Sequence, residues 1–316
     1  MLLERSLQAP SYGFRLKFYL PSGCSFFGDH SRRRLILRGG LGSIYLVRMP
    51  RPQRNRFGAR ETYCVLGKKF LSFEAAEITG RKLKQAISLF AAEQKIGLDV
   101  GKGKAGSSFS DLVKENIRAS KGVHLRDDVH GLDVYPEGLH ILAPTFEAYG
   151  FTTNVLSDYE ARIAHYVNYP DLSPKEELAL ELYNESQFEG AINTRLIALI
   201  TVVEILAEPK PRSKEATDFL NLLCGQVGAH PQLEAAEQTA LRDGFLCLRR
   251  QSISQACREF VKAHASKEAA TFFKACYSAR SELIHSGTTK KLVPEMIDRL
   301  NNLVSELLLR STNRAI

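Results

Sequence analysis

The sequence predicts an α+β fold, in which a mixed strand and helix domain precedes an all-helical bundle. In the opening third of the chain, apolar and polar residues alternate, which is typical of half-buried strands. From Ser173 onward, apolar residues recur instead with the 3.6-residue period of helices. A length of 316 residues suits two domains. We place them at residues 1–170 and 171–316, with the boundary near residues 168–173.

The first 70 residues are predicted to be rich in strands. Residues 14–20 place an apolar side chain at every second position, with Arg15 and Lys17 between them. Two further β-rich runs, at 34–38 and 43–47, flank a glycine cluster and predict a hairpin. Residues 62–66 predict another strand.

The middle of the chain begins with a helix and then loses its pattern. Ser72 is a plausible N-cap for a helix that runs to about Lys95. The glycine-rich run at 101–108 lacks the Gly-x4-Gly-Lys-Ser/Thr spacing of a phosphate loop, so we predict a flexible loop there. Residues 109–172 are weakly patterned, with short strands expected at 132–135 and 139–142 and a helix near 159–167.

The C-terminal half carries a series of helix start signals. Ser173-Pro174-Lys175-Glu176 is a capping box with proline at the first helical position. Serine N-caps or prolines precede most of the later apolar-periodic segments. We expect helices over about 173–186, 189–206, from 213, after 231, over 252–263, over 266–287 and from 294.

Composition narrows the class of protein. A hydrophobic content of 44% and a charged content of 25% exclude wholesale disorder, a collagen-like fibre and a membrane bundle. No run approaches the roughly 18 apolar residues that a spanning helix needs, and no secretory signal is visible, so we expect no membrane partner. The six cysteines are scattered and form no Cys-x-x-Cys pair, which favours reduced thiols and a cytoplasmic location.

The net charge of +8 is concentrated at the start of the chain. Residues 1–70 contain 14 Lys/Arg against three acidic residues, whereas the rest of the chain has a net charge of −3. A concentrated basic surface attracts phosphates, and nucleic acid or an acidic protein are candidate partners. A solvated basic face with no partner is the alternative. The candidate nucleic-acid contacts are Arg32, Arg33, Arg34, Arg51, Arg54 and Arg56.

The helix predicted over 266–287 holds the sharpest candidate site. Phe273, Tyr277, Arg280 and Ile284 fall on one helical face, so that Arg280 is the single charge on an apolar and aromatic stripe. A guanidinium in such a face needs an anionic partner, because leaving it unpaired is costly. A purely structural interpretation therefore pairs Arg280 with a carboxylate such as Glu204 and makes a C-terminal capping residue of the later histidine, His285.

The same segment resembles a known family. Its aromatic, Arg-x4-His and glycine pattern, formed by Tyr277, Arg280, His285 and Gly287, is similar to the tail signature of the HEPN superfamily, and more closely of its Apea-like branch. Segments 182–184, 191–199, 203–206 and 248–254 resemble that family's preceding helices. The resemblance covers about residues 173–310.

The resemblance implies a metal-independent ribonuclease that needs no cofactor. His285 is then the general acid/base, Arg280 holds the phosphate, and Tyr277 and Ser281 support them. On an unbroken helix Arg280 and His285 lie roughly 140° apart. A shared site therefore requires the helix to break at 284–287, or a second subunit to supply the other half.

Two overall interpretations follow. In the first, the chain is an RNA-directed HEPN protein, a toxin-like or phage-defence ribonuclease that forms a homodimer through its C-terminal domain. In the second, it is a non-catalytic dimerising or adaptor protein in which Arg280 and His285 are structural.

A histidine and aspartate cluster over 124–133 has residue types that bind divalent metals. Its spacing fits no known motif, and we predict a solvated loop without a metal.

Overall fold

The computed structural model describes residues 11–21, 24–26, 32–35, 43–49, 60–101, 104–107, 111–121, 124–137, 140–142, 154–156, 158–289 and 293–312. The chain divides into two compact units, Met1–Glu189 and Gly190–Ile316. The first unit holds a sheet and the second is helical, so the predicted α+β class is confirmed.

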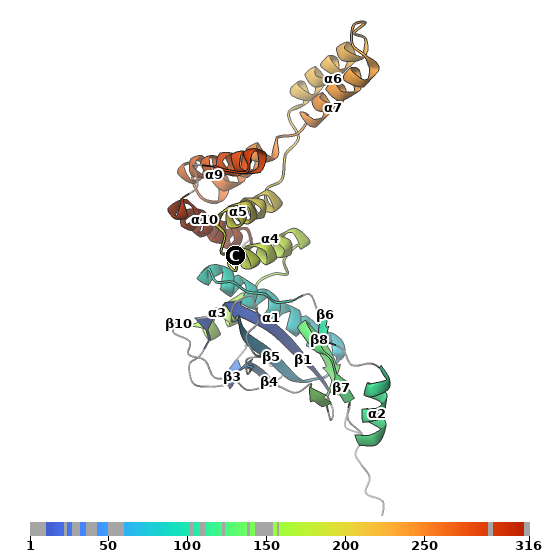
Figure 1. The fold of residues 1–316 in the computed structure, drawn as a ribbon, viewed down its shortest axis with the longest axis vertical. Helices are drawn as coiled ribbons and strands as arrows, with labels where there is room; N and C mark the ends of the chain where they lie inside the picture. The colour runs from blue at the N-terminus through green and yellow to red at the C-terminus, as the bar shows by residue number, and fades with distance from the viewer. Residues whose placement is uncertain are drawn as a thin grey trace, which may run out of the picture. The chain divides into compact units, whose positions relative to one another are not determined.

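A six-stranded antiparallel sheet organises the first unit, with strand order β3-β4-β5-β1-β8-β6 (Figure 1). The predicted hairpin is present, because β3 and β4 pair through Arg34 opposite Tyr45. The longest strands, β1 and β5, lie side by side in the middle of the sheet. The strands are β1 (Tyr12–Pro21), β3 (Arg32–Leu35), β4 (Ser43–Arg48), β5 (Arg60–Phe70), β6 (Lys104–Ser107) and β8 (Asp128–Pro136).

The alternation in β1 places one row of side chains in the core. Phe14, Leu16, Phe18 and Leu20 are fully buried on the face of the sheet that α1 (Phe73–Gln94) covers. Leu16 is in register with Leu132, and a Cβ added to Gly80 of α1 would lie 2.4 Å from Leu132 Cδ1. Glycine at position 80 therefore lets the helix approach the sheet closely.

Two further helices pack on α1. The predicted N-cap is confirmed, since Ser72 Oγ accepts a hydrogen bond from the Ala75 N–H at 3.1 Å. Helix α3 (Tyr159–Tyr166) and helix α4 (Pro174–Ser186) both contact α1, and α4 begins with the predicted Ser173–Glu176 capping box. Because α4 packs on α1, the boundary between the units follows Glu189, later than the boundary near 168–173 that the change of period suggested.

The weakly patterned middle of the chain contains elements that the sequence did not predict. Residues 104–107, expected in a flexible loop, form the edge strand β6 and pair with β8, so that prediction was wrong. Backbone hydrogen bonds to β8 hold these residues in a strand, although their glycine-rich composition is typical of a loop. Helix α2 (Asp111–Lys121) was also missed. Two small parallel pairs complete the unit, β2 (Cys24–Ser25) with β10 (Asn154–Val155) and β7 (His124–Arg126) with β9 (His140–Leu142).

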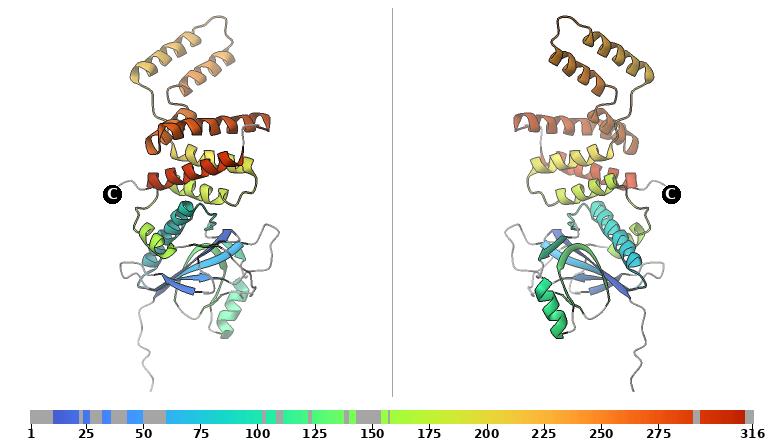
Figure 2. Two further views of the ribbon diagram at one scale, coloured as in Figure 1. Left: turned by 90° about the vertical axis from the view of Figure 1, so that its left-hand side faces the viewer. Right: turned by 90° about the vertical axis from the view of Figure 1, so that its right-hand side faces the viewer.

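The second unit is a helical bundle with a projecting hairpin. Helices α5 (Ile192–Leu206), α8 (Ile253–His264), α9 (Lys267–Ser286) and α10 (Pro294–Thr312) pack around a common core. Helices α6 (Lys214–Gly228) and α7 (Ala235–Cys247) form an antiparallel pair of their own (Figure 2). Within the described part of the chain, no helix combines the length and apolar character needed to cross a membrane.

Candidate functional site

Helix α9 carries Tyr277, Arg280 and His285 of the predicted motif, and the fourth residue, Gly287, is its C-cap. Ser266 caps its start by accepting a hydrogen bond from the Ala269 N–H at 3.1 Å. The helix runs unbroken to Ser286, where Gly287 adopts a left-handed conformation with φ 74° and donates its N–H to Leu283 O. A site within one chain requires the helix to break at 284–287, but the helix continues through Ser286.

Arg280 and Tyr277 converge on one carboxylate of α5. The Tyr277 hydroxyl donates a hydrogen bond to Glu204 Oε1 at 2.9 Å, and Arg280 Nη2 lies 3.6 Å from Glu204 Oε2. This is the ion pair that the structural interpretation of the sequence predicted. The three side chains tie α9 to α5.

The network lies at the margin of the core and leaves one buried polar atom without a partner. The Arg280 side chain is 24% exposed and that of Glu204 is 18% exposed, so the guanidinium still reaches solvent. Arg280 Nε is itself buried and has no hydrogen-bond partner among the described residues. Arg280 is thus oriented by Glu204 without having all its donors used.

The same carboxylate affects the titration of its neighbours. Burial, together with the hydrogen bond to Glu204, raises the pKa of Tyr277 to about 12. Burial and the Glu204 charge raise the pKa of the Cys257 thiol, on α8, to about 12 as well. Both groups remain protonated near neutral pH, so Cys257 is not an activated nucleophile.

His285 lies apart from this network. It is exposed in the last turn of α9, five residues beyond Arg280, and points roughly 140° away around the helix axis. Ser281 is half-buried and precedes His285 by four residues, so it lies on the His285 side of the helix. One chain therefore brings Tyr277 and Arg280 together but does not bring His285 to them.

The predicted basic contacts of the N-terminal unit are only partly described. Arg32, Arg33 and Arg34 lie on β3 at the edge of the sheet, whereas Arg51, Arg54 and Arg56 lie outside the described residues. Arg48, another arginine of the basic first 70 residues, forms an ion pair within the protein. Its Nη2 lies 2.9 Å from Glu61 Oε2, and the Glu61 side chain is fully buried.

The histidine and aspartate cluster over 124–133 lies on strands β7 and β8, so the predicted solvated loop was wrong, and its side chains contact other residues of the chain. Asp127 pairs with Lys114 at 2.7 Å, and Asp133 pairs with Arg126. His130 Nε2 lies 3.2 Å from the Asp99 carbonyl oxygen. Across the described ranges, no three side chains of metal-binding type come together.

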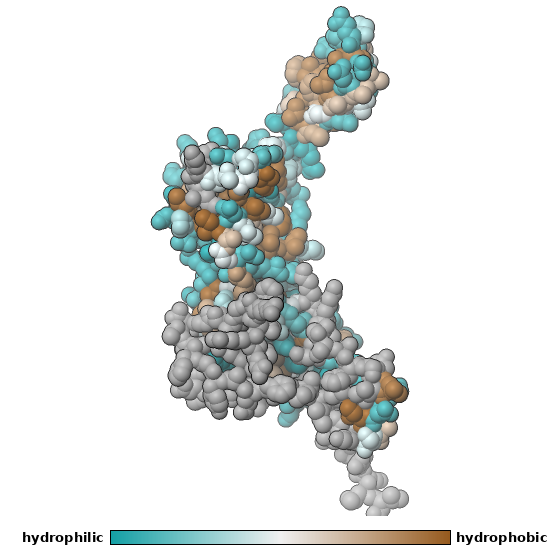
Figure 3. All heavy atoms as spheres, in the orientation of Figure 1, coloured by the Kyte–Doolittle hydropathy of each residue, from teal (hydrophilic) through white to brown (hydrophobic). Residues whose placement is uncertain are grey.

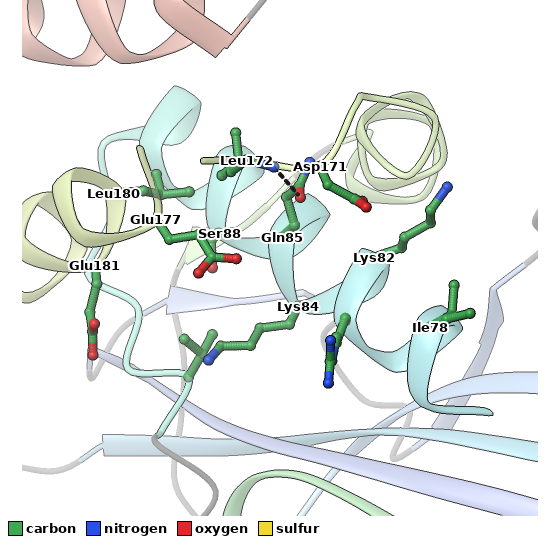
Figure 4. A pocket seen from close by; sticks show the side chains of 12 residues that line it. Ile78, Lys82, Lys84, Gln85, Ser88, Asp171, Leu172, Glu177, Leu180 and Glu181 are labelled. Atoms are coloured by element: carbon green, nitrogen blue, oxygen red, sulfur yellow. Dashed lines mark hydrogen bonds between the residues drawn. The ribbon is translucent and has the colours of Figure 1, made fainter. Parts of the chain in front are cut away.

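The first unit also has a cavity that the sequence did not reveal. The cavity has a volume of about 460 Å³ and lies between α1 and α4. Gln85 and Leu172 both line it, and the Gln85 side chain accepts a hydrogen bond from the Leu172 N–H at 3.3 Å (Figure 4). The cavity is lined by as many basic side chains, all on α1, as acidic side chains, which lie on α4 or just before it. These residues do not form a recognisable sequence motif. These charged residues are Arg81, Lys82, Lys84, Asp171, Glu177 and Glu181.

Comparison of the chain with protein-family models, with curated proteins and with solved structures finds no match in any of the three.

Proposed function

We propose that the C-terminal unit is a HEPN-like, metal-independent endoribonuclease whose active site is completed by a second copy of the chain. Arg280 binds the scissile phosphate, and His285 transfers the protons. The observation that carries the proposal is that Arg280, beside Glu204, is still partly exposed and lies on the same helix as His285, an exposed histidine without a side-chain partner among the described residues.

The chemistry suits these two side chains. The 2′-hydroxyl of the RNA attacks the adjacent phosphorus and gives its proton to a neutral imidazole. The bond from phosphorus to the 5′-oxygen breaks, and that oxygen receives a proton from an imidazolium, leaving a 2′,3′-cyclic phosphate and a 5′-hydroxyl. The guanidinium fork of Arg280 matches the phosphate oxygens and stabilises their developing charge.

A second copy supplies what one helix does not. Because Arg280 and His285 point away from each other on α9, a phosphate held by Arg280 meets His285 from another chain. A two-fold dimer contains two such composite sites. The proposed trigger or substrate contacts of the basic N-terminal unit include Arg32, Arg33 and Arg34.

The Glu204 pairing favours a second candidate function. If the Tyr277–Glu204–Arg280 network serves only to hold α5 against α9, the unit is a dimerising or adaptor module without catalysis. In that case Arg280→Ala lowers stability and no RNA is cleaved.

The test is cleavage of total RNA by the purified full chain in EDTA. His285→Ala is the test variant, and His230→Ala, at another exposed histidine, is the matched control. The proposal predicts cleavage with 2′,3′-cyclic phosphate ends that survives EDTA and the control substitution and is lost in His285→Ala. Cleavage that His285→Ala retains, or that EDTA abolishes, contradicts it.

A further inference from the structure

The α6–α7 hairpin lacks a core of its own. Leu220 is its single buried side chain on α6, and none is buried on α7. Large apolar residues are instead exposed, with Phe219 at 59% and Leu222 at 58%. Two helices that bury so little are marginal in water, because helix stability in proteins comes chiefly from packing of an apolar face.

The exposed apolar residues fall on one side of the hairpin. On α6, Phe219 and Leu222 lie about 100° and 160° from Leu220, which faces α7. On α7, the half-buried Phe245 is the reference; Leu241, and Leu248 at the helical C-cap, lie about 40° and 60° to the corresponding side of it. Since the helices are antiparallel, these rotations bring the four residues to the same side. We call Phe219, Leu222, Leu241 and Leu248 the apolar stripe.

The opposite side of the hairpin has a different character. A hollow there is lined by Asn221, Gly225, Gly228, Arg242 and Arg249, together with Leu246. Leu246 is 42% exposed, so the two sides offer leucines of similar exposure for comparison. Figure 3 shows hydrophobic and hydrophilic residues side by side on the hairpin.

The base of the hairpin holds it in place. Arg212 N–H donates to Arg249 O at 2.9 Å, and Gln251 N–H donates to Lys210 O at 3.0 Å. These bonds join the segments that enter and leave the hairpin. The hairpin that carries the apolar stripe is thus fixed at its base by backbone hydrogen bonds between the segments that enter and leave it.

We propose that the apolar stripe pairs with the same stripe of a second copy of this chain, so that two hairpins form a four-helix bundle. Such a pairing buries both stripes in one core and is closed by a two-fold axis. It does not depend on the ribonuclease activity proposed above.

Charge favours a second copy over a nucleic acid as the occupant. Residues 212–250 contain five Lys/Arg and five Asp/Glu, and the stripe itself contains no cation. The charges are divided along the hairpin, with a net +2 near its base and a net −2 toward its tip. Antiparallel pairing of two copies places each tip beside the other base, so opposite charges meet along the rim. The basal charges are Arg212, Lys214, Glu215, Asp218, Arg249 and Arg250, and the distal charges are Glu234, Glu237, Arg242 and Asp243.

The experiment measures the mass of the full chain in solution by light scattering or sedimentation over a dilution series. Leu222→Glu places a charge in the stripe, and Leu246→Glu places the same charge on the opposite side. Circular dichroism verifies that both variants keep the helical content of the wild type. The expected result is that Leu222→Glu halves the mass of the assembly and Leu246→Glu leaves it unchanged.

Three results overturn the proposal: a wild-type chain that is monomeric, a mass that Leu222→Glu does not change, or equal dissociation by both substitutions. RNA cleavage is not read in this experiment. Loss of pairing therefore bears on the stripe, and loss of cleavage in His285→Ala bears on the proposed activity.

Discussion

The Tyr277–Glu204–Arg280 network makes a quantitative prediction for Glu204→Gln. The amide oxygen of glutamine still accepts the hydrogen bond from Tyr277, so the substitution removes the charge and little else. At 3.6 Å the lost attraction to Arg280 is about 5 kcal/mol in a medium of effective dielectric constant near 20. Both side chains are roughly one-fifth exposed, so solvent compensates for much of this. We expect the second unit to lose about 1–2 kcal/mol of stability.

Hydrogen exchange measured by mass spectrometry on peptides of α5 and α9 reports this loss for the second unit alone. The slowest amides of these helices should exchange about 5- to 30-fold faster in Glu204→Gln than in the wild type. The matched control is Glu306→Gln, which removes the same charge from an exposed pair with Arg310 on α10. There we expect a change below about 0.5 kcal/mol.

A double-mutant cycle with Arg280→Met separates the ion pair from other effects of either substitution. The network requires a coupling between positions 204 and 280 of about 1 kcal/mol or more. Glu204→Gln that exchanges no faster than Glu306→Gln, or a cycle without coupling, would refute the reasoning that Glu204 holds Arg280.

Three further predictions concern the same bundle. Because the pKa of Tyr277 is raised from 10.0 to about 12, this tyrosine ionises first in the unfolded chain. Its contribution to stability is therefore fully present below pH 10 and is lost as the pH rises to about 12. Denaturant titrations at alkaline pH should show a smaller loss of stability in Tyr277→Phe than in the wild type. Gly287→Ala should cost about 1 kcal/mol by thermal unfolding, because φ 74° strains alanine while the space around it is open, and Gly287→Asn should cost less. Burial raises the pKa of Cys257 and Cys276 to about 12, so both should react with iodoacetamide far more slowly than the exposed Cys247; equal rates would contradict the packing of α8 and α9.

Local signals in the sequence predicted much of the fold. The alternation at 14–20 corresponds to β1, and the serines at 72, 173, 213, 252 and 266 each cap a helix through a side-chain hydrogen bond. These features are local because a strand face or an N-cap is determined by residues a few positions apart. Strand β6 and helix α2 were missed, since β6 depends on pairing with β8, more than twenty residues away.

The candidate site was predictable to a smaller extent. The stripe on α9 indicated a carboxylate partner for Arg280, and Glu204 was named as an example of one. The raised pKa of Cys257 was not foreseen, because it depends on how α8 packs against that carboxylate. The apolar character of α6 and α7 was visible in the sequence, but which side each helix exposes depends on their mutual packing.

The composite site is tested most directly by mixing two inactive variants. Arg280→Ala and His285→Ala chains are unfolded together, refolded and assayed for RNA cleavage in EDTA, with each variant alone as the control. If each site takes Arg280 from one copy and His285 from the other, the mixed dimer retains one intact site and cleavage returns in the mixture alone. If both residues act within one chain, or if neither is catalytic, the mixture stays inactive, and the composite-site proposal is contradicted.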